Sequence, residues 1–160
     1  ARCRLGEFLE KNNSSSPRIS QKIEYAWQSR SRPVIPAYMI SILQTYHSSM
    51  NCYICGQSIT GSPDWDHVLP FSFIGGHDLW NFMPSCGPNS GTSNNCNQQK
   101  SNKKPKKSLI QKTVSRNNDM LNWLRKPTNQ VLSNKIISDG IKDLEFAIKN
   151  KEVTRLWNSM

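Results

Sequence analysis

The chain has 160 residues, of which 36% are hydrophobic and 20% are charged, and its formal net charge is +10 at pH 7. This composition supports a modest core, too small for a large sandwich or barrel, and no stretch approaches the roughly 20 apolar residues that span a bilayer. A chain this basic most often binds a polyanion, nucleic acid above all, although a charge that only confers solubility is the simpler alternative.

Cysteine usage indicates the compartment. The five cysteines are an odd number that includes one close pair, which favours a metal site in a reducing cytosol over a framework of disulfides. The N-terminal residues ARCRLGEFLEKNN contain no apolar segment of the kind found in secretory signals. We therefore expect a cytoplasmic protein.

Two helices are predicted ahead of the first cysteine pair. Apolar residues at helical spacing predict one helix over residues 19–30. Pro36 suits the first position of the next helix, where its missing N–H has no partner to lose. His47, just past that helix, is interpreted as a surface or capping histidine. The apolar stripe of the second helix is Ile35, Met39, Ile42, Leu43 and Tyr46.

Residues 51–100 contain four of the five cysteines, as a Cys52-x2-Cys55 pair and a Cys86-x9-Cys96 pair. Four thiolates can close a tetrahedral zinc site, and the metal then replaces core that a short segment cannot supply. A redox CxxC would instead need a strand–helix context and a lone pair. Because nine residues separate the second pair, a Gly/Ser/Asn-rich loop must bring its members together.

Short strands are predicted between the two cysteine pairs. The alternation in DWDHVL over residues 64–69 is typical of a strand, with Trp65, His67 and Leu69 on one face. Residues 71–79 are expected to form a loop, and residues 80–83 a second strand. A further helix is expected to begin near Cys96.

Helices are also predicted after the basic run SNKKPKK. One follows from the helical spacing of Ile110, Val114, Leu121 and Leu124, with an interruption at Arg116, Asn117 and Asn118. One long helix or two shorter ones follow from Ile137, Ile141, Leu144, Ile148, Leu156 and Trp157.

The order CxxC, DHVLPFSF, DLWN, C…CN-x2-K resembles the HNH endonucleases of the ββα-metal nuclease superfamily, from about Pro33 to Lys107. The resemblance implies an α+β fold with a small zinc-stapled ββα-metal core at about residues 51–102. The nuclease domain would occupy residues 33–107. Residues 1–32 would be a helical extension, and residues 108–160 would form helices that pack on the core or dock a partner.

The resemblance also implies a role for each matching residue. His67 is the general base that deprotonates the attacking water, and Asp66 and Asn97 hold one divalent cation, Mg²⁺ or Mn²⁺. Asn81 braces the loop that carries the histidine. His77 matches no motif position and is interpreted as structural or surface-exposed. The four expected ligands of a structural zinc ion are Cys52, Cys55, Cys86 and Cys96.

One departure from the family pattern concerns the second cysteine pair. Many members close it as CxxCN, whereas this chain has C-x9-CN. The longer spacing weakens the assignment of Cys86 more than that of Cys96, which directly precedes Asn97.

The expected function is metal-dependent hydrolysis of DNA that leaves 5′-phosphate and 3′-hydroxyl ends. Double-stranded DNA is the expected substrate. Two alternatives remain: a zinc module that binds nucleic acid without cleaving it, and a nuclease effector that acts only with a partner, as in restriction, defence or mobile-element systems. A homodimer is compatible with either. The basic residues expected to contact the sugar-phosphate backbone are Arg30, Arg32, Lys100, Lys103, Lys104, Lys106 and Lys107.

Overall fold

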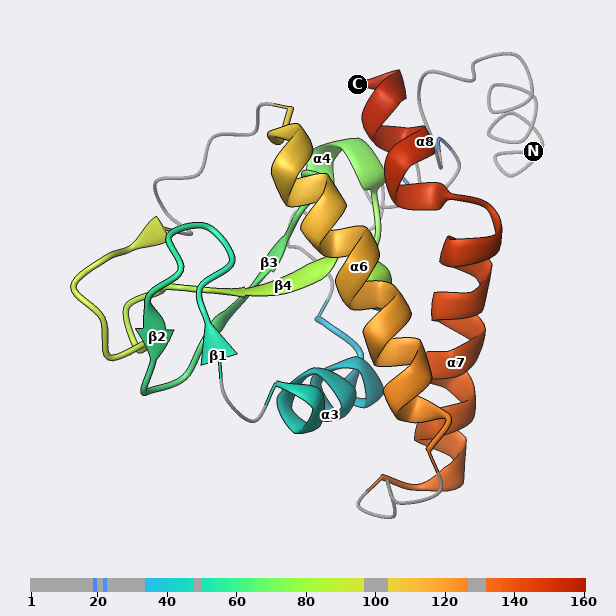
Figure 1. Ribbon diagram of the computed structural model, residues 1–160, viewed down its shortest axis with the longest axis horizontal. Helices are drawn as coiled ribbons and strands as arrows, with labels where there is room; N and C mark the ends of the chain where they lie inside the picture. The colour runs from blue at the N-terminus through green and yellow to red at the C-terminus, as the bar shows by residue number, and fades with distance from the viewer. Residues whose placement is uncertain (1–18, 20–21, 23–33, 48–49, 97–103, 127–131) are drawn as a thin grey trace.

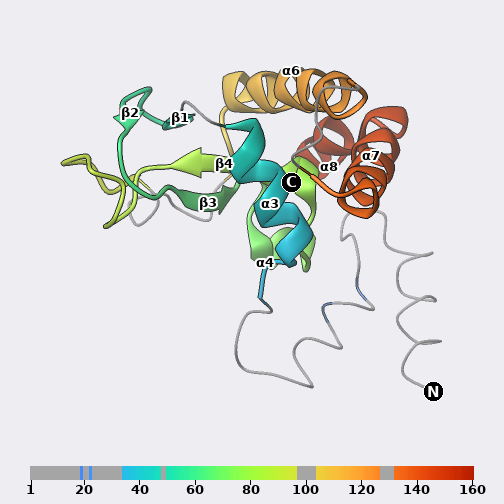
Figure 2. The same ribbon diagram turned by 90° about the horizontal axis from the view of Figure 1, so that it is seen from below.

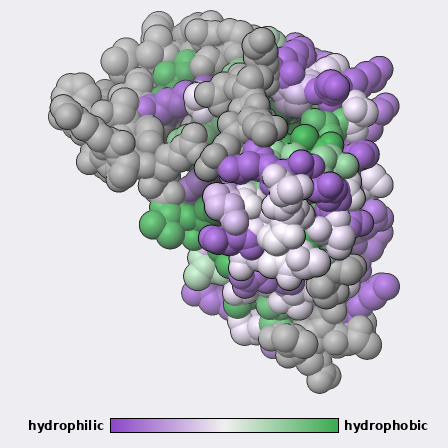
Figure 3. Space-filling view, turned by 90° about the vertical axis from the view of Figure 1, so that its left-hand side faces the viewer, coloured by the Kyte–Doolittle hydropathy of each residue, from purple (hydrophilic) through white to green (hydrophobic). Residues whose placement is uncertain are grey.

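The structure is a computed structural model that describes residues 19, 22, 34–47, 50–96, 104–126 and 132–160. It combines helices with two small two-stranded sheets, so the predicted α+β class is confirmed. The β1–β2 hairpin lies at one end of the molecule, and the β3–β4 ribbon runs from it toward α6, α7 and α8 (Figures 1 and 2). Viewed from the hairpin end, the described surface is largely polar, with several small apolar patches (Figure 3).

The elements follow one another in a simple order along the chain. The strands are β1 (Met50–Asn51), β2 (Ser58–Ile59), β3 (Asp64–His67) and β4 (Phe82–Ser85). The helices are α3 (Ala37–Tyr46), α4 (Phe71–Ile74), the 3-10 turn η1 (Leu79–Asn81), α6 (Lys107–Leu124), α7 (Asn134–Lys149) and α8 (Glu152–Ser159). Within the described ranges, no helix is both long and apolar enough to cross a membrane.

Both sheets are antiparallel. In the first, Met50 pairs with Ile59, and in the second the register runs from Asp64 opposite Ser85 to His67 opposite Phe82. The strand predicted over residues 64–69 therefore begins where expected but ends two residues early. Val68 and Leu69 both lie in the core, fully buried, so the predicted alternation of faces fails after His67.

The segment between β3 and β4 is more ordered than predicted. Residues 71–79, expected to be a loop, contain α4, which ends at Gly75 with a φ of 76°, a left-handed conformation that glycine adopts without strain. The predicted strand at residues 80–83 is also displaced, because Leu79–Asn81 form η1 and β4 begins only at Phe82.

Helix α3 begins one residue later than predicted, with Pro36 at its N-cap, and it buries Met39, Ile42 and Leu43. His47 caps its end through a backbone N–H donated to Leu43 O. Of the two predicted positions, surface or capping, the structure shows the capping one: the ring is half-buried and lies next to the rings of Tyr46 and Trp65. Burial, together with the charge of Arg116, lowers the pKa of His47 to about 4.

Helix α6 runs unbroken from Lys107 to Leu124, so the predicted interruption at residues 116–118 is wrong. Arg116 and Asn117 are buried and point to the segment from η1 into β4. Arg116 donates to the carbonyls of Leu79, Trp80 and Phe82, and Asn117 Nδ2 donates to Trp80 O at 3.1 Å. Val114, expected in the apolar stripe, is instead 37% exposed.

The C-terminal part forms two helices rather than one. Ser133 caps α7, its Oγ accepting from Ile136 N, and Lys151, at a φ of 48°, separates α7 from α8. Helix α7 packs against α3, α6, α8 and η1. At Gly140 the packing on α3 leaves no room for a Cβ, which would lie 2.4 Å from Ile42 Cδ1. One apolar core thus joins α3, β3, β4 and the C-terminal helices.

Replacing Arg116 by methionine is expected to lower the free energy of unfolding by about 2–4 kcal/mol, because buried carbonyls lose their donor while the cost of burying a charge is relieved. Burial lowers the pKa of Arg116 to about 10. Urea denaturation would measure the loss. Lys112→Met on the exposed side of the same helix is the matched control, and equal stability of the two variants would contradict the prediction.

Candidate functional site

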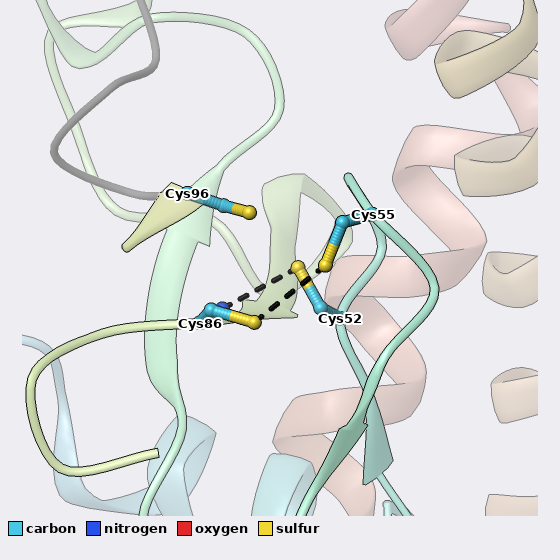
Figure 4. Close-up of side chains that lie close together, drawn as sticks. All are labelled: Cys52, Cys55, Cys86 and Cys96. Atoms are coloured by element: carbon cyan, nitrogen blue, oxygen red, sulfur yellow. Dashed lines mark hydrogen bonds between the residues drawn. The ribbon is translucent and has the colours of Figure 1, made fainter. Parts of the chain in front are cut away.

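The four cysteines of residues 52–96 converge on one point. Their Sγ atoms all lie within 4.8 Å of one another, and the side chains approach from two opposite segments (Figure 4). Sulfur atoms around a tetrahedral zinc ion are about 3.8 Å apart, given a Zn–S distance of about 2.3 Å. The Cys55 and Cys86 sulfur atoms are 3.7 Å apart. The cluster can therefore hold a metal ion such as zinc, and Cys86 belongs to it despite the long spacing.

Backbone N–H groups point at the cluster. Cys86 N lies 3.4 Å from Cys52 Sγ, and a hydrogen bond from the Gln57 N–H is the main reason why the pKa of Cys55 falls to about 6. Burial raises the pKa of Cys86 and raises that of Cys96 to about 12. A bound cation would draw out those remaining protons, so metal binding should release protons.

The nine-residue loop between Cys86 and Cys96 is tied to the segment that follows β2. Thr60 N and Gly61 N both donate to Ser90 O, at 3.1 and 3.0 Å, and Ser62 N donates to Asn89 O at 2.7 Å. Gly61 permits this approach, since a Cβ there would lie 2.2 Å from Asn89 O. The loop thus lies against the segment that follows β2, and it still brings Cys96 back to the cysteine cluster.

The end of β3 carries the predicted carboxylate and imidazole. Asp66 and His67 are adjacent strand residues, so their side chains leave on opposite faces. Tyr53 Oη donates to Asp66 Oδ2 at 2.7 Å. Because Tyr53 directly follows Cys52 and its N–H donates to Pro84 O, it connects the cysteine cluster to the Asp66 carboxylate.

Asn81 fixes the backbone immediately after His67. Its Oδ1 accepts from Leu69 N at 2.8 Å, its Nδ2 donates to Leu69 O at 3.0 Å, and its carbonyl accepts from Val68 N at 2.8 Å. The side chain is fully buried. Asn81 in turn is held by the contacts of Arg116 and Asn117 with η1, so the C-terminal helices support this corner.

His77, interpreted from the sequence as structural or surface-exposed, is half-buried and lies against His67. Nε2 of His67 and Nδ1 of His77 are 3.1 Å apart. His67 is 7% exposed, and its ring also contacts Phe71 and Phe82.

Several predicted site residues lie outside the described part of the chain: Asn97, Lys100, Lys103, Arg30 and Arg32. Asn97 follows Cys96, whose side chain is in the cluster. Of the remaining predicted DNA contacts, Lys104, Lys106 and Lys107 are exposed at the start of α6. The Lys104 ammonium lies 4.5 Å from the centroid of the Trp157 ring, whose Nε1 donates to Pro105 O at 2.8 Å.

The sequence gives no role to Tyr53 at this corner, and it does not predict the contacts that His77 and Arg116 make there. Tyr53 could have been noticed only as an aromatic residue between two cysteines, which is a weak signal. Arg116 contacts carbonyls 34 to 37 residues away along the chain, and nothing in the local sequence of His77 indicates its contact with His67.

No family model, curated protein or solved structure matches this chain.

Proposed function

We propose that this chain is a metal-dependent HNH endonuclease that hydrolyses phosphodiester bonds in double-stranded DNA. The observation that carries the proposal is the corner at the end of β3. There a carboxylate (Asp66) and an imidazole (His67) occupy adjacent positions of β3, and an asparagine (Asn81) bonds both backbone groups of Leu69. A four-cysteine cluster lies one residue from Tyr53, the partner of Asp66. These contacts between motif residues support the proposal that the chain is an HNH endonuclease.

Asp66 and Asn97 would hold one divalent cation. A carboxylate and a carboxamide offer oxygen ligands, which suit Mg²⁺ or Mn²⁺ and leave positions for water and phosphate oxygens. The Tyr53 hydroxyl orients the carboxylate through a short bond to Oδ2. When bound, the cation would stabilise negative charge on the scissile phosphate and on the leaving oxygen.

His67 then acts on the attacking water. Its imidazole takes one proton as the water oxygen forms a bond to phosphorus, in line with the leaving group. The bond between phosphorus and the 3′ oxygen breaks, which yields a 5′-phosphate and, once protonated, a 3′-hydroxyl. Asn81 keeps the histidine in place by holding residues 68–69.

Binding of DNA is assigned to the basic residues at the start of α6. Lys104, Lys106 and Lys107 are exposed at the start of α6, and the chain as a whole carries a net charge of +10. Contacts of this kind bind phosphates without reading bases, and each neutralised phosphate steepens the salt dependence of log K by about 0.9.

Supercoiled plasmid, incubated with the zinc-loaded chain, is expected to be cleaved when Mg²⁺ or Mn²⁺ is added and to stay intact without them. Asp66→Asn should reduce the rate at least about 100-fold, because several kcal/mol of charge stabilisation depend on the cation. Gel quantification of the supercoiled form measures the rate.

The matched control is Asp64→Asn, two residues back on the same strand, where the carboxyl lies against Gly87. It should cleave like the unmodified chain. Absence of cleavage by the unmodified chain with both cations contradicts the proposal, and a loss confined to Asp64→Asn contradicts the assignment of Asp66.

A further inference from the structure

We propose that His77 is a positioning residue for His67: its Nδ1 accepts the Nε2–H of His67 and so keeps the basic lone pair of His67 on Nδ1. This inference deepens the proposed function and rests on it for its catalytic meaning. The hydrogen bond itself can be tested without any cleavage reaction.

The geometry of the two rings supports a hydrogen bond rather than stacking. Their planes differ by 21° and their centroids are 5.1 Å apart, yet Nε2 of His67 and Nδ1 of His77 are only 3.1 Å apart. Because the nitrogens are much closer together than the centroids, the rings meet edge to edge. An N–H in the plane of one ring then points at the in-plane lone pair of the other.

Only one proton fits between these two nitrogens. If His77 donated it, a neutral His67 would carry its own proton on Nδ1 and expose no basic nitrogen away from His77. If His67 donates it, Nδ1 of His67 is the basic nitrogen. For His67 to act as a general base, His67 must be the donor. This is the case when neutral His77 carries its own proton on Nε2, because its Nδ1 can then only accept.

The same bond persists through the reaction. When Nδ1 of His67 takes a proton from water, the ring becomes an imidazolium that still carries its Nε2–H. That N–H continues to donate to Nδ1 of His77, which helps to stabilise the new positive charge. No proton needs to leave His77 at this step.

The fold places His77 for this role. Its loop follows the left-handed turn at Gly75 and directly precedes Asp78, the N-cap of η1. Phe71 and Phe82 lie against both histidine rings. His77 therefore orients the ring of His67, while Asn81, at the other end of the same short segment, holds its backbone.

Two substitutions separate this role from simple packing. His77→Leu has a comparable volume but no acceptor, whereas His77→Asn keeps an acceptor oxygen near the position of Nδ1. We expect His77→Leu to lower kcat for plasmid cleavage roughly 10–100-fold with KM little changed, the range seen when the hydrogen-bond partner of a metal-ligating histidine is lost. His77→Asn should recover most of the rate, and melting temperatures should stay close to that of the unmodified chain.

Nitrogen-15 NMR of the zinc-loaded chain gives a readout that does not depend on activity. With three histidines in the chain, the rings can be assigned by substitution. His67 should be protonated on Nε2 in the unmodified chain and in His77→Asn, and should populate the other tautomer in His77→Leu. A His67 protonated on Nδ1 in the unmodified chain, or an unchanged tautomer in His77→Leu, overturns the inference.

The two readouts keep the hypotheses apart. If the unmodified chain does not cleave, the proposed function fails while the tautomer still decides whether the hydrogen bond exists. If it cleaves and His77→Leu cleaves equally fast, or His77→Asn is as slow as His77→Leu, the role of His77 is wrong and the proposed function stands.

Discussion

Replacing His67 by glutamine is expected to slow single-turnover plasmid cleavage about 10²–10⁴-fold, the usual contribution of a general base. Glutamine approximates the size of the buried ring and can still donate to His77, but it cannot take a proton from water. His67→Ala should be equally slow, with an additional loss of stability because the ring packs against Phe71 and Phe82.

His47→Gln is the control for removing a histidine as such, since His47 is half-buried at the end of α3 beside Tyr46 and Trp65. It should leave the cleavage rate unchanged. DNA affinity, measured by fluorescence anisotropy with Ca²⁺ in place of Mg²⁺, should be the same for both glutamine variants. Cleavage by His67→Gln within a few-fold of the unmodified rate would remove His67 from the role of base.

The metal cluster was the easiest part of the site to predict, because thiolates are few and their chemistry is narrow. The two cysteine pairs were enough to expect one site, and the structure brings all four sulfur atoms together. The long Cys86–Cys96 spacing made Cys86 a less certain ligand from the sequence. The loop is held by hydrogen bonds to residues 60–62, which are distant in sequence and therefore could not be predicted. Local composition predicts a flexible loop and says nothing of its partner.

The boundaries of β3, η1 and β4 were harder to predict, for a related reason. Hydrophobic periodicity places a strand at Trp80, but the carbonyls of Leu79 and Trp80 bind Arg116 and Asn117 on α6, and Leu79 N donates to Asp143 on α7. Residues 79–81 therefore form a 3-10 turn held by long-range contacts, although the local sequence pattern favours an extended strand.

The same contacts explain the error in α6. The sequence predicts an interruption at Arg116, Asn117 and Asn118, which are polar residues within an apolar stripe, and charged side chains are rarely fully buried. Arg116 and Asn117 are both buried, and they bond to backbone carbonyls around the η1 turn. Polar residues on the core-facing side of a helix can thus hydrogen-bond to a loop distant in sequence, and they do not necessarily indicate the end of the helix.

Loss of the metal site is expected to have the largest effect on stability. Structural zinc sites in small domains contribute about 10–16 kcal/mol of apparent binding free energy. The hairpin of β1 and β2 has only two residues in each strand, and the buried cluster around it consists of Ile59 and three of the cysteines, with Met50 packed alongside. Without an ion, the described residues at this end are held mainly by backbone hydrogen bonds such as those of residues 60–62 to residues 89–90.

The chain should therefore contain one zinc ion by native mass spectrometry, and Cys86→Ser should lose it or bind it far more weakly. Cobalt(II) substitution should give the visible spectrum of a tetrahedral tetrathiolate site, which weakens when one thiolate is removed. Cys3→Ser, which changes the one cysteine outside the two pairs, is the matched control and should keep both the metal and the spectrum.

Cleavage should disappear with the zinc as well, because Tyr53 lies between two cysteines and donates to Asp66. When the hairpin loosens, the carboxylate loses the hydroxyl that orients it.

Tyr53→Phe separates the loss of zinc from the loss of the hydroxyl, since it should keep zinc while lowering cleavage in Mg²⁺. Cys86→Ser with one tightly bound zinc ion and an unchanged cobalt spectrum would exclude Cys86 as a ligand and require a fourth donor from elsewhere in the chain.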